Sequence, residues 1–407
     1  MKLPKSSLKD NETITISGSK SISNRLLILQ HLFHNLSIEN LSNSQDTQLL
    51  QAALQSDEAV IDIHHAGTAM RFLTSYFAIQ EGRSVVLTGS ERMQNRPIGF
   101  LVEALRELGA EISYIEKEGF PPLQITGRKI VKSTVAIPAH ISSQFISSLM
   151  LIGSQLENGL QIILEGKITS RPYLEMTLKI LRNIGIDTEW KDQRIRISPL
   201  NKKDRTSVSL KFLCESDWSS ASYYYSLAAI GQQSINLKSF RPHSLQGDSA
   251  LKEIYWQFFG VNTISQGSES KISLYPESSF VLPEIISLDM NSCPDIAQTV
   301  CVTATALQIP FHLTGLSTLK VKETDRLTAL KNELFKIGCI CEITDDSITS
   351  TKFFEPHQNI SIETYNDHRM AMSFAPFCLV KELNIENEKV VEKSYPEFWT
   401  DLAQILY

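Results

Sequence analysis

The chain has little of what marks a membrane or nucleic-acid-binding protein. No apolar run approaches the roughly 20 residues that a membrane-spanning helix needs, and the first residues, MKLPKSSLKDNET, lack the apolar core of a signal peptide. The chain has 45 Asp and Glu residues against 39 Lys and Arg, which gives a net charge of −6. It therefore lacks the excess of basic residues that usually binds the phosphate backbone of a nucleic acid. We therefore expect a cytoplasmic location, no membrane partner and no nucleic-acid partner.

The cysteines also lack the spacings of a metal site or a disulfide framework. The 6 cysteines form no CxxC pair and no spacing typical of a zinc site or a disulfide framework. Most lie within apolar stretches, where a thiol behaves as a small apolar side chain. The sequence therefore predicts reduced core thiols and no metal site. These residues are Cys214, Cys293, Cys301, Cys339, Cys341 and Cys378.

A repeat organises the chain, which has 407 residues and no long Gly/Ser linker. Four apolar segments with helical period each end at a glycine and lead into a short β-like run. The glycines recur about every 75 residues, a period too long for a solenoid. We expect a left-handed helix cap at each of them. They are Gly109, Gly185, Gly260 and Gly338.

A second series of helices shares this period and interleaves with the first. These helices look buried but begin with small and polar residues, as in SKSISNRLLIL, AGTAMRFL, SSQFISSL, SDWSSASYYY, SCPDIAQT and YNDHRMAM. Runs rich in β-branched residues, such as LQIILEG and QRIRIS, separate the helices. The sequence thus predicts an α/β protein of six units, each made of β-strands and two helices.

Charged side chains gather at the starts of these helices. A helix N-terminus offers free N–H groups to an anion, and arginine binds carboxylate or phosphate through two parallel hydrogen bonds. We expect a ligand with at least two anionic groups, beside carboxylates placed among cations that can move protons. The charged residues include Lys20, Arg25, Arg71, Arg96, Arg171, Lys322, Glu323, Asp325, Arg326, Asp367, His368 and Arg369.

Simpler explanations exist for several of these features. GSKS at Gly18 contains a lysine before a serine but lacks the GxxxxGK[ST] spacing of a nucleotide P-loop. KETDRL can be a charged first turn with intrahelical ion pairs, and Arg96 and Arg171 can be surface arginines. The serines of SSQF can serve as helix caps. Only the clustering of all these groups in an acidic chain favours a binding site.

The motifs resemble one family in order and over almost the whole chain. They are KSISNR, HAGTAMR, LTGSERMQNRPI, SSQF, SRPY, SLQGD, NSCPDIAQT, VKETDRL, YNDHRMAM and EKSYPEFW. This series resembles the 5-enolpyruvylshikimate-3-phosphate synthase family of enolpyruvyl transferases. The resemblance implies transfer of an enolpyruvyl group from phosphoenolpyruvate to the 5-hydroxyl of shikimate 3-phosphate, with release of phosphate. That reaction belongs to the shikimate pathway of chorismate and aromatic amino acid biosynthesis.

The resemblance also implies a fold. It is a two-domain α/β fold, an inside-out α/β barrel, built from six repeated βαβαββ units with three in each domain. The first domain would comprise residues 1–19 and 216–407, the second residues 20–215, with chain crossings near Ser19 and Glu215. The active site would lie in the cleft between the domains. The family implies no cofactor and no metal, and we expect a monomer.

Site residues follow from the family motifs. The resemblance implies that Asp295 is the proton acceptor, that Lys322 lies beside the reacting hydroxyl and that Glu323 relays a proton to the methylene carbon. Lys20 would contact both substrates and is grouped with these catalytic residues. The implied shikimate 3-phosphate contacts are Lys20, Ser21, Arg25, Ser142, Ser143, Gln144, Ser170, Tyr173, Asp295, Thr318 and Lys322. The implied phosphoenolpyruvate contacts are Lys20, Gly67, Arg96, Gln144, Arg326, Arg369 and Lys393.

Three positions depart from the family pattern. His65 stands where asparagine is common, and Phe72 stands where a proline often follows the arginine. Thr318 occupies a position where asparagine frequently contacts the shikimate side. These positions bear on the shape of the phosphoenolpyruvate pocket and on one shikimate contact.

Two other functions are compatible with the same scaffold. An enolpyruvyl transferase acting on UDP-N-acetylglucosamine shares the fold and the donor, but its cysteine-bearing loop has no counterpart in LTGSERMQNRPI. A non-catalytic binding protein would be expected to lose Asp295, Lys322 or Glu323, and all three are present. The sequence therefore favours transfer to shikimate 3-phosphate.

Overall fold

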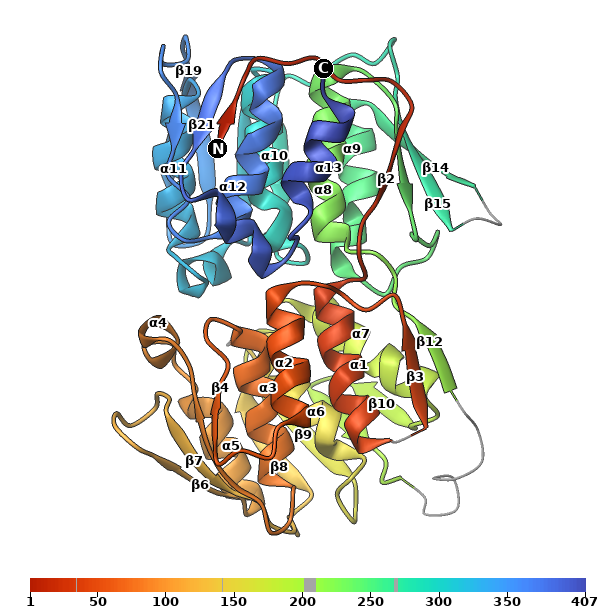
Figure 1. Cartoon of the computed structure of the whole chain (residues 1–407), viewed down its shortest axis with the longest axis vertical. Coiled ribbons are helices and arrows are strands. Elements are labelled where there is room, and N and C mark those ends of the chain that lie inside the picture. Colours follow the sequence, from red (N-terminus) through yellow and green to blue (C-terminus); the bar gives the residue numbers. More distant parts are fainter. Residues whose placement is uncertain (34, 141, 201–209, 267–269) are drawn as a thin grey trace. The chain divides into compact units, whose positions relative to one another are not determined.

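The computed structural model describes residues 1–33, 35–140, 142–200, 210–266 and 270–407. Its chain divides into two compact units, shown in Figure 1. Unit 1 comprises Met1–Gly18 and Glu215–Tyr407, and unit 2 comprises Ser19–Cys214. The chain begins in unit 1, builds the whole of unit 2 and returns to complete unit 1.

Four of the six sheets found in the described residues repeat one topology. The first strand pairs in parallel with the second, the second pairs antiparallel with the fourth, and the fourth pairs antiparallel with the third. Unit 2 holds two of these sheets, whose strands are given in spatial order. The first consists of β4 (Val60–Asp62), β5 (Ser84–Thr88), β7 (Leu123–Thr126) and β6 (Glu111–Tyr114). The second consists of β8 (Thr134–Pro138), β9 (Leu160–Glu165), β11 (Arg194–Ile197) and β10 (Thr188–Lys191). Unit 1 holds the other two. One consists of β2 (Glu12–Thr15), β13 (Ile235–Lys238), β15 (Lys271–Pro276) and β14 (Val261–Gln266). The other consists of β16 (Ile286–Asp289), β17 (Phe311–Thr314), β19 (Ile348–Phe353) and β18 (Cys339–Ile343).

The remaining two sheets are smaller. In unit 2, β12 (Leu210–Leu213) pairs in parallel with β3 (Leu36–Glu39). In unit 1, β21 (Leu383–Ile385) lies between β20 (Ser361–Ile362) and β1 (Lys2–Leu3), so the chain's first strand completes its last repeat. The expected count of three repeats in each domain is confirmed. The full βαβαββ pattern holds for four repeats, whereas these two have fewer strands in the described part of the chain.

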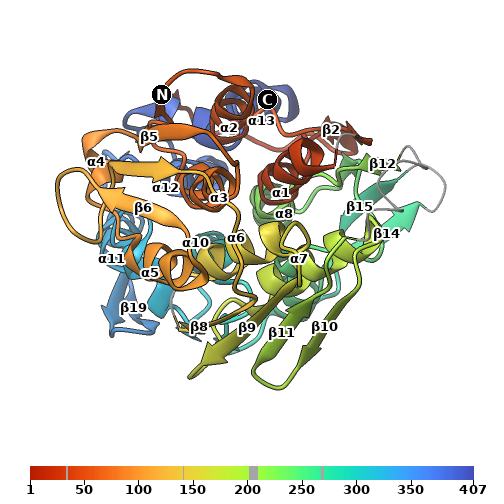
Figure 2. The ribbon, with the colours of Figure 1, turned by 90° about the horizontal axis from the view of Figure 1, so that it is seen from below.

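A buried helix leads into the second strand of each repeat. In unit 2, α3 packs against both α1 and α6, and in unit 1, α10 packs against both α8 and α12. Figures 1 and 2 show these helices inside their units, with sheets outside them, as expected for an inside-out barrel. The helices are α1 (Lys20–Leu32), α3 (Gly67–Ala78), α6 (Ser143–Gly153), α8 (Trp218–Gly231), α10 (Ala297–Ala306) and α12 (His368–Phe374).

A second set of helices covers the sheets and carries the glycine caps. All four predicted glycines have positive φ, between +67° and +111°, so the left-handed caps are confirmed. The longer members are α2 (Gln45–Gln55), α5 (Gly99–Leu108), α7 (Arg171–Asn183), α9 (Leu251–Phe259), α11 (Arg326–Lys336) and α13 (Phe398–Ile405). The short helices are α4 (Glu91–Gln94), η1 (Gly247–Ala250), η2 (Pro294–Ile296), η3 (Ser317–Val321), η4 (Ala375–Leu379) and η5 (Glu388–Lys393).

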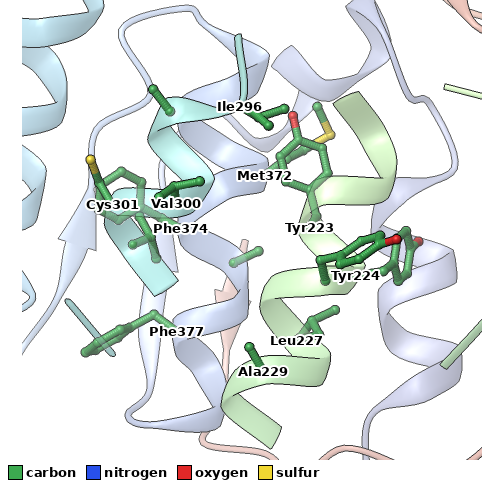
Figure 3. Packing of buried hydrophobic residues seen from close by; sticks show 14 of the residues in the cluster. Tyr223, Tyr224, Leu227, Ala229, Ile296, Val300, Cys301, Met372, Phe374 and Phe377 are labelled. Carbon is green, nitrogen blue, oxygen red and sulfur yellow. The ribbon is translucent and has the colours of Figure 1, made fainter. Parts of the chain in front are cut away.

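The core of unit 1 lies where its inner helices meet. Figure 3 shows Tyr223 and Leu227 of α8 near Val300 of α10 and Met372 of α12, and all four side chains are buried. Burying an apolar side chain of this size contributes about 1.5–3 kcal/mol. Because the inner helices are fixed by this packing, their N-terminal residues are held in place.

The expected burial of the cysteines in the core is confirmed. All six thiols are free and buried. Among the described residues, no helix has both the length and the apolar character to cross a membrane. In the same part of the chain, no cluster of three or more His, Cys, Asp or Glu side chains could hold a metal ion.

Candidate functional site

The site residues expected in unit 2 lie at the starts of its helices or in the loop after α4. Lys20, Ser21 and Arg25 lie in the first two turns of α1, and Gly67 begins α3. The remaining residues of this set, which we call the unit-2 polar group, are Arg96 after α4, Ser142, Ser143 and Gln144 at the start of α6, and Ser170 and Tyr173 at the start of α7.

Arg25 joins three of these helices. Its guanidinium donates to the Ser21 carbonyl at 2.8 Å, to Thr177 Oγ1 at 2.7 Å and to Ser147 Oγ at 3.0 Å. Burial lowers the pKa of Arg25 to about 10, because these partners are neutral and water is excluded. The Phe72 ring lies 5.3 Å from the guanidinium carbon. A buried cation with neutral partners is suited to bind an anionic ligand.

Arg96 and Gly67 form a second contact within this group. A Cβ at Gly67 would lie 2.4 Å from Arg96 Nη1, so the absence of a side chain there makes room for the guanidinium. Arg71 fixes the surrounding backbone, since it donates to the carbonyls of Gly67 at 3.1 Å and Pro97 at 3.0 Å. His65 is tied to the same loop through Ser90 Oγ, at 2.8 Å. Arg96 is thus held over the start of α3.

The other members of the unit-2 polar group are neutral or ion-paired. Ser142 caps α6 by accepting from the Gln144 backbone N–H, and the Gln144 side chain reaches Thr68 Oγ1 at 3.3 Å. Lys20 Nζ lies 3.4 Å from Asp46 Oδ2 on α2. Ser170 adopts a left-handed backbone conformation, with φ of +51°, immediately before α7. This arrangement places a cation, hydroxyls and an amide at helix starts.

Gly67→Ala tests the expectation that Arg96 contacts phosphoenolpyruvate. The new methyl group cannot remain 2.4 Å from Nη1, so the guanidinium must move. If Arg96 contacts phosphoenolpyruvate as the resemblance implies, the KM for that substrate should rise about tenfold, a loss of about 1.4 kcal/mol, with the KM for shikimate 3-phosphate unchanged. Steady-state kinetics on both substrates test this.

Gly99→Ala is the matched control for this substitution. Its Cβ would approach no atom closer than 3.4 Å, which is ordinary contact. An equal rise of the donor KM in both variants would contradict the assignment of Arg96 to the donor.

Arg326 is the centre of the charged residues in unit 1. It is 2% exposed and contacts three carboxylates, with Nε to Asp367 Oδ2 at 2.7 Å, Nη1 to Asp295 Oδ1 at 2.9 Å and Nη2 to Glu323 Oε2 at 2.7 Å. Burial alone would lower the pKa of Arg326, but Asp367, Glu323 and Asp295 outweigh it and raise that pKa. One buried cation therefore fixes carboxylates from three separate segments, which are η2, the bend before α11 and the residue that caps α12.

The other cations of unit 1 reach the same carboxylates. Arg369 Nη1 donates to the Asp295 carbonyl at 2.8 Å, and its Nη2 lies 3.4 Å from Asp295 Oδ2. Lys322 Nζ lies 3.5 Å from Asp295 Oδ1, and Lys393 Nζ lies 2.8 Å from Glu323 Oε1. We call this set the unit-1 charged group: Asp295, Lys322, Glu323, Arg326, Asp367, Arg369 and Lys393.

Asp295 remains ionised in this environment. Burial alone would raise the pKa of Asp295, but Arg369, Lys322 and Arg326 together hold that pKa well below its usual range. Its side chain is 12% exposed, which leaves an approach for a substrate atom. An ionised carboxylate that is partly exposed can accept a proton from a hydroxyl.

Several neighbours of the site were missed by sequence reasoning. Asp367 was noted only as a charge at a helix start, without a role of its own, although it bonds Arg326 and caps α12 through the Arg369 backbone N–H. Asp248 and Ser219 lie within SLQGD and SDWSSAS, which were noted as motifs without a role. Thr318, an expected contact, lies on η3, and its buried Oγ1 has no hydrogen-bond partner in the described part of the chain.

The chain is similar to proteins of one kind across nearly all its length. The family model described as EPSP synthase (3-phosphoshikimate 1-carboxyvinyltransferase) matches residues 50–402. A 3-phosphoshikimate 1-carboxyvinyltransferase of Bacteroides fragilis is 45% identical over 398 residues, covering 96% of this chain and 94% of that protein. The same enzyme of Shewanella woodyi is 33% identical over 423 residues, covering 97% and 96% of the two chains.

Solved structures share the fold at lower sequence identity. The EPSP synthase of Acinetobacter baumannii aligns with a TM-score of 0.75 at 22% identity, covering 99% of this chain and 97% of that one. The enolpyruvyl transferase NikO of Streptomyces tendae aligns with a TM-score of 0.70 at 10% identity, covering 98% and 95%. The fold expected from the sequence is confirmed by these likenesses.

Proposed function

This chain belongs to the EPSP synthase (3-phosphoshikimate 1-carboxyvinyltransferase) family of transferases, and we propose the substrates and residue roles of its reaction. It transfers the enolpyruvyl group of phosphoenolpyruvate to the 5-hydroxyl of shikimate 3-phosphate, giving 5-enolpyruvylshikimate 3-phosphate and phosphate. The reaction serves the shikimate pathway and so the synthesis of chorismate and aromatic amino acids. No cofactor is required, because the steps are proton transfers, an addition and an elimination.

The observation that carries this proposal is the environment of Asp295. Three cations keep it ionised while 12% of its side chain stays exposed. A carboxylate in that state can take the proton of the attacking hydroxyl, and Lys322 Nζ, 3.5 Å away, can hold the hydroxyl oxygen. General base catalysis of this kind contributes a factor of about 10²–10⁴ in rate.

The reaction balances with these groups. A proton added to the methylene carbon of phosphoenolpyruvate leaves cationic character at the neighbouring carbon, and the 5-hydroxyl oxygen adds there as its proton passes to Asp295. The tetrahedral adduct then loses phosphate, and a proton leaves the methyl carbon to restore the double bond. In this proposal Glu323, which Arg326 and Lys393 hold in place, relays the proton at this carbon. Nearby carboxylates stabilise the cationic character.

In this proposal each substrate is assigned residues from both groups. In the unit-2 polar group, Arg25, Lys20 and Ser21 bind the anionic and hydroxyl groups of shikimate 3-phosphate. The other acceptor contacts are Ser142, Ser143, Gln144, Ser170, Tyr173 and Thr318, with Asp295 and Lys322 at the reacting hydroxyl. Arg96 above Gly67 binds phosphoenolpyruvate together with Lys20, Gln144, Arg326, Arg369 and Lys393. Holding both anions in attack geometry replaces an encounter in solution.

A phosphate-release assay with three acceptors tests the proposal. Phosphoenolpyruvate should release phosphate only when shikimate 3-phosphate is supplied. UDP-N-acetylglucosamine tests the alternative transferase, and a no-acceptor reaction tests simple hydrolysis. Equal release with the UDP-sugar, or none with either acceptor, would overturn the proposed substrates. Binding of both substrates without any turnover would favour a non-catalytic protein on this scaffold.

We also propose that the protein acts as a monomer in the cytoplasm. The free thiols of its six cysteines support a reducing compartment. Sedimentation at micromolar concentration should give a mass near 45.8 kDa. Twice that mass would contradict the monomer.

A further inference from the structure

Asp248 is a buried carboxylate of unit 1 outside the group assigned above. It lies on η1 and is 3% exposed. Its Oδ2 accepts a hydrogen bond from Ser219 Oγ, a hydroxyl in the first turn of α8. The positive end of that helix favours a negative charge at this place.

Ser219 connects Asp248 to the charged group. Arg369 Nη2 donates to Ser219 Oγ at 3.2 Å, while Nη1 of the same guanidinium donates to the Asp295 carbonyl at 2.8 Å. A serine hydroxyl has one proton and two lone pairs. Because the proton points to Asp248, a lone pair of Ser219 is left to accept from Arg369.

The charge of Asp248 is poorly compensated. Burial and the nearby Asp295 raise its pKa to about 6, against the lowering effect of Arg369 and Ser219. The negative charge of Asp217 also raises the pKa of Asp248. Burial, and then the charge of Asp248, raise the pKa of the Cys293 thiol. Asp248 Oδ1 is buried with no hydrogen-bond partner in the described residues. Arg369 and the hydrogen bond from the Ser219 hydroxyl together stabilise its charged form.

The backbone before Asp248 is tied to the start of α8. Gln246 Nε2 donates to the Ser216 carbonyl at 2.8 Å and to Glu215 Oε2 at 3.2 Å. The Trp218 backbone N–H donates to Gln246 Oε1 at 3.0 Å. These bonds keep η1 against the first turn of α8, so Asp248 and Ser219 are held together.

We propose that Asp248 is a positioning residue for the enolpyruvyl donor, which fixes the Ser219 hydroxyl so that Ser219 orients the guanidinium of Arg369. The inference rests on the proposed function, because Arg369 is assigned there to phosphoenolpyruvate. Asp248 acts through two other side chains and does not itself contact the donor.

Kinetics of Asp248→Ala, Ser219→Ala and the double variant test this role. Each single variant should raise the KM for phosphoenolpyruvate about tenfold, with kcat lowered less than about threefold and the KM for shikimate 3-phosphate unchanged. Since both residues act through the same contact with Arg369, the KM for phosphoenolpyruvate should be no higher in the double variant than in either single variant. Asp248→Asn should recover most of the loss, because its amide oxygen can still accept from Ser219.

Glu333→Gln provides the matched control. Glu333 is a fully buried carboxylate of the same unit that pairs with Lys336 and Tyr365, away from Arg369. Its variant should leave both KM values unchanged. Additive effects of Asp248→Ala and Ser219→Ala, or an unchanged donor KM in Asp248→Ala and Ser219→Ala alike, would overturn the inference. A wild-type protein without acceptor-dependent phosphate release would instead overturn the proposed function.

Discussion

Asp295→Ala is expected to lower kcat by a factor of about 10²–10⁴, with substrate KM values changed much less. The substitution removes the carboxylate that three cations hold ionised, and with it the acceptor for the hydroxyl proton. Asp295→Asn preserves the size of the side chain but cannot accept the proton, so it should lose a similar factor. Steady-state turnover of both variants, measured at saturating substrates, tests the assignment.

Asp345→Ala is the control for the Asp295 variants. Asp345 belongs to the same unit and pairs with Lys320, but its side chain is 97% exposed. Its turnover should equal that of the wild-type protein. A turnover within tenfold of wild type for Asp295→Asn would remove Asp295 from the proton transfer, and would show that its negative charge is not needed either.

Arg326→Ala should have the largest effect on stability. It would leave Asp295, Glu323 and Asp367 close together without the cation that each now contacts. Removing one partner of a buried ion pair costs about 3–5 kcal/mol, because the remaining charge is buried and uncompensated. Urea unfolding monitored by circular dichroism should show this loss, together with loss of turnover.

The loss of stability in Arg326→Ala should depend on pH. In the wild type, the lowered pKa of Asp295 contributes stability above the usual carboxyl range, and this contribution disappears as the pH falls through the lowered pKa. In Arg326→Ala, protonation of the carboxylates relieves their repulsion. The stability deficit should therefore be smaller near about pH 4 than near about pH 7.

Arg171→Ala serves as the control for Arg326→Ala. Arg171 is 58% exposed and pairs with Glu175 four residues along α7. An exposed pair contributes about 0–1 kcal/mol. If both variants lost the same small amount of unfolding free energy, Arg326 would not organise the unit-1 charged group.

The repeat could be predicted from the sequence because helix ends and helix starts depend on residues that are neighbours in the chain. Gly109 and Gly260 each end an apolar helical segment, and only a left-handed cap explains a glycine at that place. The polar helix starts were likewise visible, since SSQF and NDHR interrupt otherwise apolar segments. Family motifs added the residue roles, which spacing alone left open between capping, surface charge and binding.

Other features depend on contacts between distant segments and could not be read from spacing. Arg326 and Asp367 are 41 residues apart yet joined at 2.7 Å, and Asp248 meets Ser219 across 29 residues. The reduced repeats also escaped prediction, because β1 joins β21 from the opposite end of the chain. A pattern of single residues carries no signal for such pairings.

The most direct test is the mass of the product formed from phosphoenolpyruvate and shikimate 3-phosphate in D₂O. The proposed reaction predicts shikimate 3-phosphate enlarged by one enolpyruvyl group, with deuterium in its methylene carbon, since that carbon gains and loses a proton during transfer. Free phosphate should appear in equal amount. Pyruvate as the only organic product, or an enolpyruvyl product without deuterium at that carbon, would contradict this account.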